Sequence, residues 1–285
     1  MAKTYNDLYI WARKQLKDAG IEGYALEARI MVANAAGKTT EALMRDMRLY
    51  TGDDVEKKLL PMIERRLKGE PVGYITGEWE FYGIPILVDS STLIPRMDTE
   101  LMVDLALKAV KGKKMDARVL DLCCGSGCIG CAIAHELPAS RVVMVDKSAA
   151  ALSVSRKNVQ LNKLSPRVTC LEADVLQPPP MLVGNFDLVC CNPPYIPTAD
   201  IAGLDSTVRD FEPLTALDGG EDGLDFYRGV LKNWKGVLRH GGLMLFEVGI
   251  GQAEDVKKLM LLSGFLGVES VKDTGGIDRV VMGRI

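Results

Sequence analysis

The chain has 285 residues, of which 47% are hydrophobic and 26% are charged, and its formal net charge is −3. This composition is typical of a globular protein that is long enough for two domains. The slight negative charge excludes a global positive field, so we expect no stable nucleic acid binding. No apolar run of about 18 residues predicts a membrane span, and the first residues match neither a secretory signal nor an Arg-rich presequence. We therefore expect a cytoplasmic protein without membrane contact.

The seven cysteines and two histidines do not indicate a metal or hydrolase centre. The cysteines stand mostly in apolar segments, as reduced thiols do, and their odd number argues against a disulfide framework. Four of them fall between residues 123 and 131, but no second CxxC pair accompanies them, so we expect no metal site. His135 and His240 are far apart in sequence, which disfavours a His-dependent triad.

Residues 1–71 carry apolar positions at helical spacing and hardly any strand signal. The pattern predicts four helices: one ending near Gly20, one ending at Gly37, one capped by Thr40, and one beginning near residue 53. The apolar stripe of the fourth helix consists of Leu59, Leu60, Ile63 and Leu67. We expect a small helical bundle, which serves either interaction with a partner or structural support.

The helical pattern ends at residues 72–94. Two short strand signals, at 78–82 and 84–88, flank Gly83. We expect a β-hairpin that links the helical domain to a second domain at 95–285.

Strand and helix signals alternate through the second domain. The expected strands cover residues 119–122, 141–146, 167–172, 186–191, 243–248, 265–271 and 277–283. The expected helices cover residues 100–110, 128–137, 148–162, 223–238 and 252–263. This order predicts the α/β class, with a doubly wound, mostly parallel seven-stranded sheet.

A glycine-rich loop follows the first strand of this domain. The segment Gly125–Gly130 has the form G-x-G-x-x-G, and Asp146 ends the next strand about 20 residues on. Taken alone, this spacing predicts a dinucleotide such as NAD. Asp121 opposes that prediction, because an acid just before the glycines repels a pyrophosphate and attracts an ammonium group.

S-adenosylmethionine satisfies both ends of this site. We expect its amino acid portion near Asp121 and the glycine loop, and its ribose hydroxyls on Asp146. Asp174 follows the third strand, where it can meet the adenine amino group. The alternative for each acid is a capping or surface carboxylate.

Asn192-Pro193-Pro194-Tyr195 follows the apolar strand 186–191. Open α/β sheets bind their ligands at the carboxyl ends of such strands. The two prolines fix φ and leave carbonyls free to accept hydrogen bonds. A stiff turn with an amide and an aromatic ring suits a planar group that donates two N–H bonds, although an ordinary strand-to-helix loop is the alternative.

With these features in one order, the sequence resembles the class I S-adenosylmethionine-dependent methyltransferases, whose fold is Rossmann-like. Its Asn-Pro-Pro-Tyr turn narrows the resemblance to enzymes that methylate planar amide or amino nitrogens, in glutamine, adenine or cytosine. The stretches 73–77, 93–100, 211–217 and 220–224 look like those of the release factor glutamine methyltransferases. The resemblance covers nearly the whole chain, including the helical amino-terminal domain that such enzymes use against their protein substrate.

The resemblance implies the following binding residues. The cofactor would be bound by Asp121, Cys123, Cys124, Gly125, Ser126, Gly127, Asp146, Asp174, Val175 and Asn192. The substrate would be bound by Arg96, Asn192, Pro193, Pro194, Tyr195, Phe211, Glu212 and Pro213. Two positions depart from the family, which commonly has Pro at Met97 and Gly at Cys123.

The family mechanism implies that Asn192, Pro193, Pro194 and Tyr195 are catalytic. The Asn192 side-chain oxygen and the Pro193 carbonyl would accept the two protons of a glutamine amide, with Tyr195 against the amide plane. In-line transfer then needs positioning rather than a strong base. The implied partners are class I peptide chain release factors, on which we expect the enzyme to act as a monomer.

Four alternatives stay open at the level of sequence. Methylation of a ribosomal protein glutamine uses the same chemistry. Methylation of DNA adenine needs a basic groove and base flipping, which the acidic balance disfavours. An NAD oxidoreductase and a cofactor-binding scaffold without methyl transfer are the others.

Overall fold

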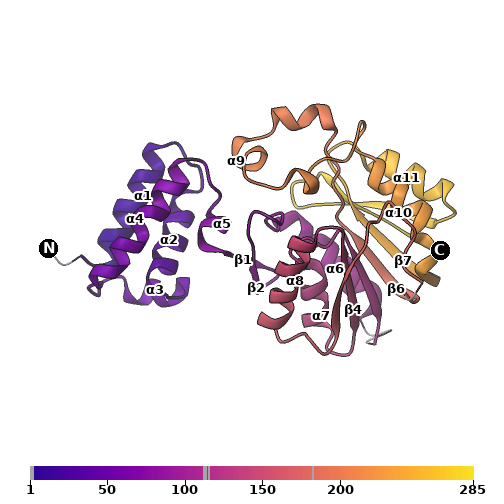
Figure 1. Ribbon diagram of the computed structural model, residues 1–285, viewed down its shortest axis with the longest axis horizontal. Helices are drawn as coiled ribbons and strands as arrows, with labels where there is room; N and C mark the ends of the chain where they lie inside the picture. Colours follow the sequence, from indigo (N-terminus) through magenta and orange to yellow (C-terminus); the bar gives the residue numbers. More distant parts are fainter. Residues whose placement is uncertain (1–2, 112–113, 115, 182) are drawn as a thin grey trace. The chain divides into compact units, whose positions relative to one another are not determined.

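The computed structural model describes residues 3–111, 114, 116–181 and 183–285. It divides into two compact units. One consists of the chain up to Glu78 together with Ser206–Phe211, and the other of Trp79–Asp205 and Glu212–Ile285. The first is helical and the second contains the sheet (Figure 1).

The helical unit contains five amino-terminal helices. They are α1 (Tyr5–Asp18), α2 (Tyr24–Ala35), α3 (Thr40–Asp46), α4 (Asp53–Leu67) and α5 (Val72–Thr76). Helix α1 begins with a capping box, in which Thr4 and Asp7 satisfy each other's backbone N–H groups. The core of the unit consists of Leu8, Leu16, Met31, Leu43, Leu59 and Ile63, all at most 2% exposed.

Two sequence predictions for this region are wrong in detail. Leu60 and Leu67 were expected to face inward but are 41% and 44% exposed, because Val55 and Met62 complete the buried face of α4. Helix α5 occupies residues that were expected to belong to the hairpin linker. The hairpin itself consists of β1 (Glu78–Phe81) and β2 (Ile84–Leu87). The helical pattern therefore extends five residues into the expected linker.

The second unit is built on a seven-stranded sheet with the order β5-β4-β3-β6-β7-β9-β8. Its strands are β3 (Arg118–Leu122), β4 (Arg141–Asp146), β5 (Val168–Glu172), β6 (Phe186–Cys191), β7 (Leu238–Glu247), β8 (Leu266–Lys272) and β9 (Asp278–Arg284). Strands β3 to β7 pair in parallel, whereas β9 is antiparallel to both β7 and β8. The mostly parallel doubly wound sheet expected from the sequence is thus confirmed.

Helices cover both faces of this sheet (Figure 1). The helices α6 (Glu100–Val110), α7 (Cys128–Glu136) and α8 (Ala149–Leu161) pack on one face, and α10 (Asp225–Asn233) and α11 (Ala253–Leu262) on the other. The insertion before α10 contains only short elements: η2 (Thr198–Gly203), α9 (Ser206–Arg209) and η3 (Leu214–Ala216). Two further turns, η1 (Met97–Thr99) and η4 (Lys235–Val237), precede α6 and β7.

Strand β7 begins earlier than the sequence indicates. Residues 239–242 lie between the expected helix 223–238 and the expected strand 243–248, but they belong to β7 and form a bulge in it. The pairing with β6 shifts from Phe186 opposite Leu238 to Leu188 opposite Leu243, and Gly241 takes a φ of +77°. A bulge absorbs extra residues without ending a strand, so glycines here do not mark its boundary.

The sheet order fixes where a ligand can bind. After β3 the chain runs outward to β4 and β5 and then returns to β6 on the other side of β3. The carboxyl ends of β3 and β6 therefore lie at the switch point of a doubly wound sheet, where ligands bind. Both the glycine loop and the Asn-Pro-Pro-Tyr turn begin there.

Candidate active site

Asp121 lies near the carboxyl end of β3 and is fully buried. Its Oδ2 accepts a hydrogen bond of 2.9 Å from the Gly130 N–H at the start of α7. Its Oδ1 has no partner among the described residues. Burial raises the pKa of Asp121 to about 7, and the nearby Asp146 adds to the shift. A buried acid with one open oxygen is a ready partner for a cation.

The glycines of the loop after β3 have distinct roles. Gly125 and Gly127 adopt φ values of +53° and +78°, which side chains rarely tolerate. A Cβ on Gly125 would point into open space, so the loop leaves room above its backbone for a ligand. A Cβ on Gly130 would lie 2.6 Å from the Met144 sulfur, so this glycine lets α7 approach β4.

Cys123 is a departure from the family with a structural explanation. Its φ is +57°, in the left-handed region that favours glycine. A glycine at this position would therefore adopt the same backbone without strain. The Cys123 thiol lies within hydrogen-bonding reach of Cys191, the last residue of β6.

Two side chains of α8 hold the glycine loop, and the sequence did not single them out. The Ser155 hydroxyl donates to the Gly125 carbonyl at 2.7 Å. The fully buried Asn158 donates to the carbonyls of Ser126 and Leu87, each at 2.9 Å, and accepts from the Leu87 N–H at 2.6 Å. Asn158 thereby joins the loop to the hairpin strand β2. The sequence did contain one signal for Asn158, because it is a polar residue on the inner face of an amphipathic helix.

Asp146 ends β4 beside the same loop. Its two oxygens accept hydrogen bonds from the N–H groups of Gly125 at 2.8 Å and Ser148 at 2.9 Å. Burial raises its pKa, and these backbone bonds oppose the shift. Asp174, after β5, is half-buried and accepts from the Leu176 N–H, with Val175 buried between them. The three acids thus stand at the ends of three adjacent strands.

The turn Asn192–Tyr195 continues directly from β6. Pro193 and Pro194 are buried, whereas Asn192 and Tyr195 are half-buried. The Asn192 side-chain NH₂ points to the Thr99 hydroxyl at 3.5 Å. Burial raises the pKa of Tyr195 to about 12, so its phenol stays neutral.

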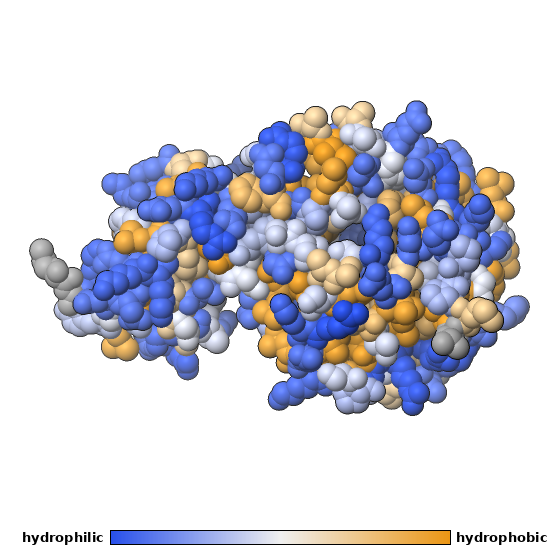
Figure 2. Space-filling model, viewed as in Figure 1, coloured by the Kyte–Doolittle hydropathy of each residue, from blue (hydrophilic) through white to orange (hydrophobic). Residues whose placement is uncertain are grey.

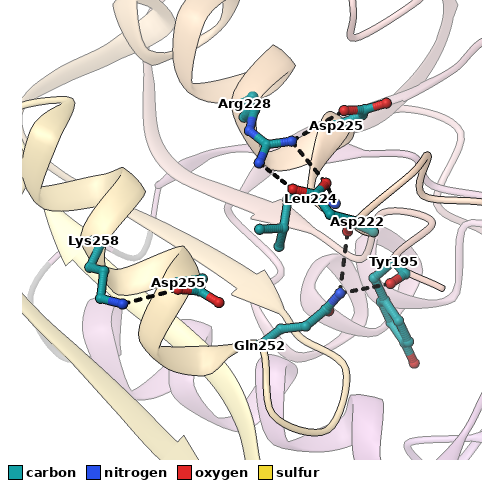
Figure 3. Close-up of polar contacts among 9 residues, drawn as sticks. Tyr195, Asp222, Leu224, Asp225, Arg228, Gln252, Asp255 and Lys258 are labelled. Atoms are coloured by element: carbon teal, nitrogen blue, oxygen red, sulfur yellow. Dashed lines mark hydrogen bonds and ion pairs between the residues drawn. The ribbon is translucent and has the colours of Figure 1, made fainter. Parts of the chain in front are cut away.

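Gln252, just before α11, holds the backbone of Tyr195 (Figure 3). Its Nε2 donates to the Tyr195 carbonyl at 2.8 Å and to the Gly223 carbonyl at 3.4 Å. Its Oε1 accepts from the Gly249 N–H at 3.0 Å. In Figure 3 the Tyr195 ring extends away from Gln252, so the glutamine fixes the turn without covering the ring. Nothing in the sequence pattern indicated this residue.

Glycines pack tightly around the same turn. A Cβ on Gly219 would lie 2.8 Å from the Tyr195 Cα, and one on Gly223 would lie 2.3 Å from the Tyr195 carbonyl oxygen. A Cβ on Gly249 would approach the Tyr195 ring at 3.0 Å. The insertion, with Gly219 and Gly223, and the loop after β7, with Gly249, can therefore lie directly against the turn only because these positions lack side chains.

The expected substrate residues divide between the two units. Arg96 and Glu212 form an ion pair of 2.6 Å, in which the Glu212 carboxyl is buried and its second oxygen has no partner among the described residues. Arg96 is thus held in an ion pair and is not simply a solvated loop charge. Phe211 belongs to the helical unit, where its ring lies beside Gly69. Pro213, next to Glu212, belongs to the sheet unit.

A separate cavity of about 280 Å³ lies near the amino-terminal end of β6, away from the glycine loop and the turn Asn192–Tyr195. Its lining includes Lys114 and Arg239, which both bind Asp187, at 2.7 and 2.8 Å. Because both cations are already paired with Asp187, this cluster fastens β6 to its surroundings. The strand-end acids and the turn Asn192–Tyr195 lie at the carboxyl ends of the strands instead.

Within the part of the chain that the structure describes, no group of three or more His, Cys, Asp and Glu side chains could hold a metal ion. None of the helices there combines the length and the hydrophobicity that crossing a bilayer requires.

Comparison with known proteins gives matches over the whole chain. Residues 7–77 match the PrmC N-terminal domain and residues 98–204 the Methyltransferase small domain. The chain is 40% identical to the release factor glutamine methyltransferase of Geobacter sulfurreducens, covering 99% of this chain and 97% of that one. It is 43% identical to the enzyme of the same name from Thermodesulfovibrio yellowstonii, over 78% of each.

Among solved structures, the chain is similar to the hMettl16 catalytic domain, with a TM-score of 0.57. The match has 17% sequence identity and covers 81% of this chain and 82% of that one. At this identity the likeness supports the fold alone.

Proposed function

Because the chain belongs to the release factor glutamine methyltransferase family, we propose that it methylates the glutamine of the Gly-Gly-Gln loop in class I peptide chain release factors. The methyl donor of this family is S-adenosylmethionine, and the acceptor is the side-chain amide nitrogen. The observation that carries the proposal is the Asn-Pro-Pro-Tyr turn, which stands at the switch point beside a buried acid with one open oxygen.

The glycine loop and the strand-end acids fit the cofactor. The open Oδ1 of Asp121 offers an anionic partner to the ammonium group. The bare backbone at Gly125 allows close approach, with Cys123, Cys124, Ser126 and Gly127 completing the loop. We assign Asp146 to the ribose hydroxyls and Asp174 with Val175 to the adenine ring. When bound, the cofactor supplies an electrophilic methyl group on a sulfonium.

Asn192 and Pro193 present acceptors to the glutamine amide. An amide nitrogen is a weak nucleophile, because its lone pair is delocalised into the carbonyl. The Asn192 Oδ1 and the Pro193 carbonyl accept hydrogen bonds from its two N–H groups and so orient the nitrogen toward the methyl group. Pro194 keeps the turn stiff. The Tyr195 ring packs against the amide plane, and Gln252 holds its backbone.

We assign recognition of the protein substrate to the helical unit, which consists of the chain up to Glu78 and of Ser206–Phe211. In the chain, the hairpin strands β1 and β2 follow this first part and precede the rest of the methyltransferase domain. Figure 2 shows that the visible surface of the helical unit is mostly hydrophilic, with scattered hydrophobic side chains. Such a surface suits a transient protein contact better than a permanent one. We propose a monomer that works in the cytoplasm, where release factors act.

Arg96 and Glu212 serve this recognition indirectly. Their ion pair joins the loop before η1 to the insertion that follows the catalytic turn. Pro213 continues from Glu212 and begins the turn η3. We propose that the pair sets the shape of the substrate entrance rather than contacting the glutamine.

One labelling experiment separates this function from its alternatives. The protein is incubated with labelled S-adenosylmethionine and, in parallel, a class I release factor, a ribosomal protein fraction or DNA. We expect label in the release factor, and none when the glutamine of its Gly-Gly-Gln loop is replaced by Ala. Label only in the ribosomal fraction or DNA would support those substrates, and no label in any sample would support a scaffold.

A further inference from the structure

Glu247 is a buried acid next to the turn Asn192–Tyr195. None of the roles proposed above belongs to it. It is the last residue of β7 and is only 2% exposed. Its Oε2 has no hydrogen-bond partner among the described residues. A buried carboxylate with an open oxygen destabilises a fold, so its presence at this place calls for a function.

The sheet register brings Glu247 beside Asn192. Cys191 of β6 lies opposite Phe246 of β7 in the parallel pairing. The next residue on each strand is therefore Asn192 on one side and Glu247 on the other. Both leave the sheet at the edge where the substrate amide has to lie.

Thr99 completes a small network between these side chains. The side chains of Thr99 and Asn192 both lie within hydrogen-bonding reach of the Glu247 carboxyl. The Asn192 NH₂ also points to the Thr99 hydroxyl at 3.5 Å. Thr99 is itself 2% exposed, so water does not compete for these contacts.

The charge on Glu247 fixes the direction of these bonds. An ionised carboxylate only accepts, so it requires the Asn192 NH₂ to point inward. The Asn192 Oδ1 is then turned away from Glu247, as an acceptor for a substrate N–H. A protonated Glu247 can donate to the Asn192 Oδ1 instead, which turns the amide group around and presents NH₂ where an acceptor is needed.

Resting on the proposed function, we infer that Glu247 is a positioning residue that orients the Asn192 amide so that its oxygen faces the substrate glutamine. Burial raises the pKa of Glu247 to about 7, and hydrogen bonding by Thr99 and attraction to Arg279 oppose this shift. The charged and titratable groups that face Glu247 are Arg279 from β9, Asp98 from η1, Tyr195 from the turn Asn192–Tyr195, Tyr227 from α10 and Cys128 from α7.

The test compares Glu247→Gln and Glu247→Met at saturating cofactor, with a release factor as substrate. Met offers no acceptor, so we expect kcat to fall about 100-fold, by analogy with the loss of one preorganised hydrogen-bonding group. Gln can still accept through its Oε1, so we expect a smaller fall, of about 10-fold. Calorimetric cofactor affinity should stay within about 2-fold of wild type in both variants.

The pH profile gives a readout that a merely structural role would not move. In the wild-type enzyme, kcat should rise with pH through about 7 as Glu247 ionises. In Glu247→Gln this rise should disappear. Glu254→Gln is the matched control, because Glu254 is an exposed residue of α11 and the substitution is the same.

A Glu247→Met variant that folds and keeps wild-type kcat would overturn the inference. If that variant does not fold, the decision falls to Glu247→Gln, and an unchanged rise of kcat near pH 7 there would overturn it. Failure of the wild-type enzyme to methylate the release factor is a different result, because it contradicts the proposed function itself.

Discussion

In the proposed reaction, the side-chain oxygen of Asn192 accepts a hydrogen bond from an N–H group of the substrate amide. The structure places its amide next to Thr99, at the edge of a buried network. Its removal should therefore affect the transition state more than the binding of the cofactor.

We predict that Asn192→Ala lowers kcat by about 10²–10³, the usual loss when one preorganised hydrogen-bonding group is removed from an active site. Cofactor affinity, measured by calorimetry, should change little, because the loop and the strand-end acids stay intact. Normal turnover in a folded variant would contradict the role of Asn192.

Asp121 makes cofactor binding dependent on pH. The acid pairs with an ammonium group only when it is ionised, and burial raises its pKa to about 7. The affinity for S-adenosylmethionine should consequently rise as pH increases from about 6 to about 8. Asp121→Asn should bind more weakly and lose this dependence in a titration across that range. A variant that keeps the wild-type pH dependence would remove Asp121 from the ammonium site.

Glu247 makes the folded protein less stable at high pH. Its pKa is about 7 in the folded state and lies near 4.5 in an unfolded chain, so the folded state binds the proton more tightly. The contribution of Glu247 to the free energy of unfolding therefore decreases as pH rises from about 4.5 to about 7.

Glu247→Gln removes this charge while keeping the shape of the side chain. At pH 8 the variant should be more stable than wild type by about 1–3 kcal/mol, and the difference should vanish near pH 4. Urea unfolding at the two pH values measures it. A variant that is both more stable and less active would mark Glu247 as retained for catalysis.

At the scale of elements, helix α8 couples the hairpin to the cofactor loop. Asn158 bonds to both backbone groups of Leu87 in β2 and to the Ser126 carbonyl in the loop. Asn162, one turn later, donates to the Pro85 carbonyl at 2.9 Å but is more exposed. The two residues form a matched pair, since only Asn158 reaches the loop.

We predict that Asn158→Ala destabilises the protein by about 2–4 kcal/mol, because one buried and two part-buried backbone groups lose their partners. It should also weaken cofactor binding. Asn162→Ala should lower stability by less than about 1 kcal/mol and leave cofactor binding unchanged. Thermal unfolding and calorimetry on both variants test this. Equal effects of the two substitutions would mean that Asn158 has no special link to the loop.

The elements were largely predictable because strands here alternate with helices in strong apolar patterns. The limits of β6, α8 and β9 agree with expectation to within about a residue. The start of β7 was predicted five residues too late, because a bulge that contains glycines looks like a turn in the sequence. Helix α5 was missed because a five-residue helix gives too short a pattern to read.

The sequence predicted the residues of the site only where they form contiguous motifs. The glycine loop and Asn192–Tyr195 are contiguous motifs, so they stand out in one sequence. Asn158 contacts Ser126 across 32 residues of chain, and Gln252 contacts Tyr195 across 57. Glu247 lies beside Asn192, which is equally remote in the sequence. Each of the three looks like an ordinary residue of its segment. Their roles follow from pairing between strands and helices, which local patterns do not contain.

At the scale of the molecule, the chain joins a helical unit to a methyltransferase sheet. Family membership covers both parts, since one family model matches residues 7–77 and another 98–204. The proposed division, in which the sheet unit positions the amide and the helical unit recognises the protein substrate, suits an acceptor glutamine carried on a folded partner.

The most direct measurement is mass spectrometry of a class I release factor after incubation with the enzyme and S-adenosylmethionine. The proposed function predicts a gain of one methyl group on the side chain of the Gly-Gly-Gln glutamine, and no gain with Asn192→Ala in the same time. A methyl group on any other residue, or none at all with folded wild-type enzyme and bound cofactor, would contradict it.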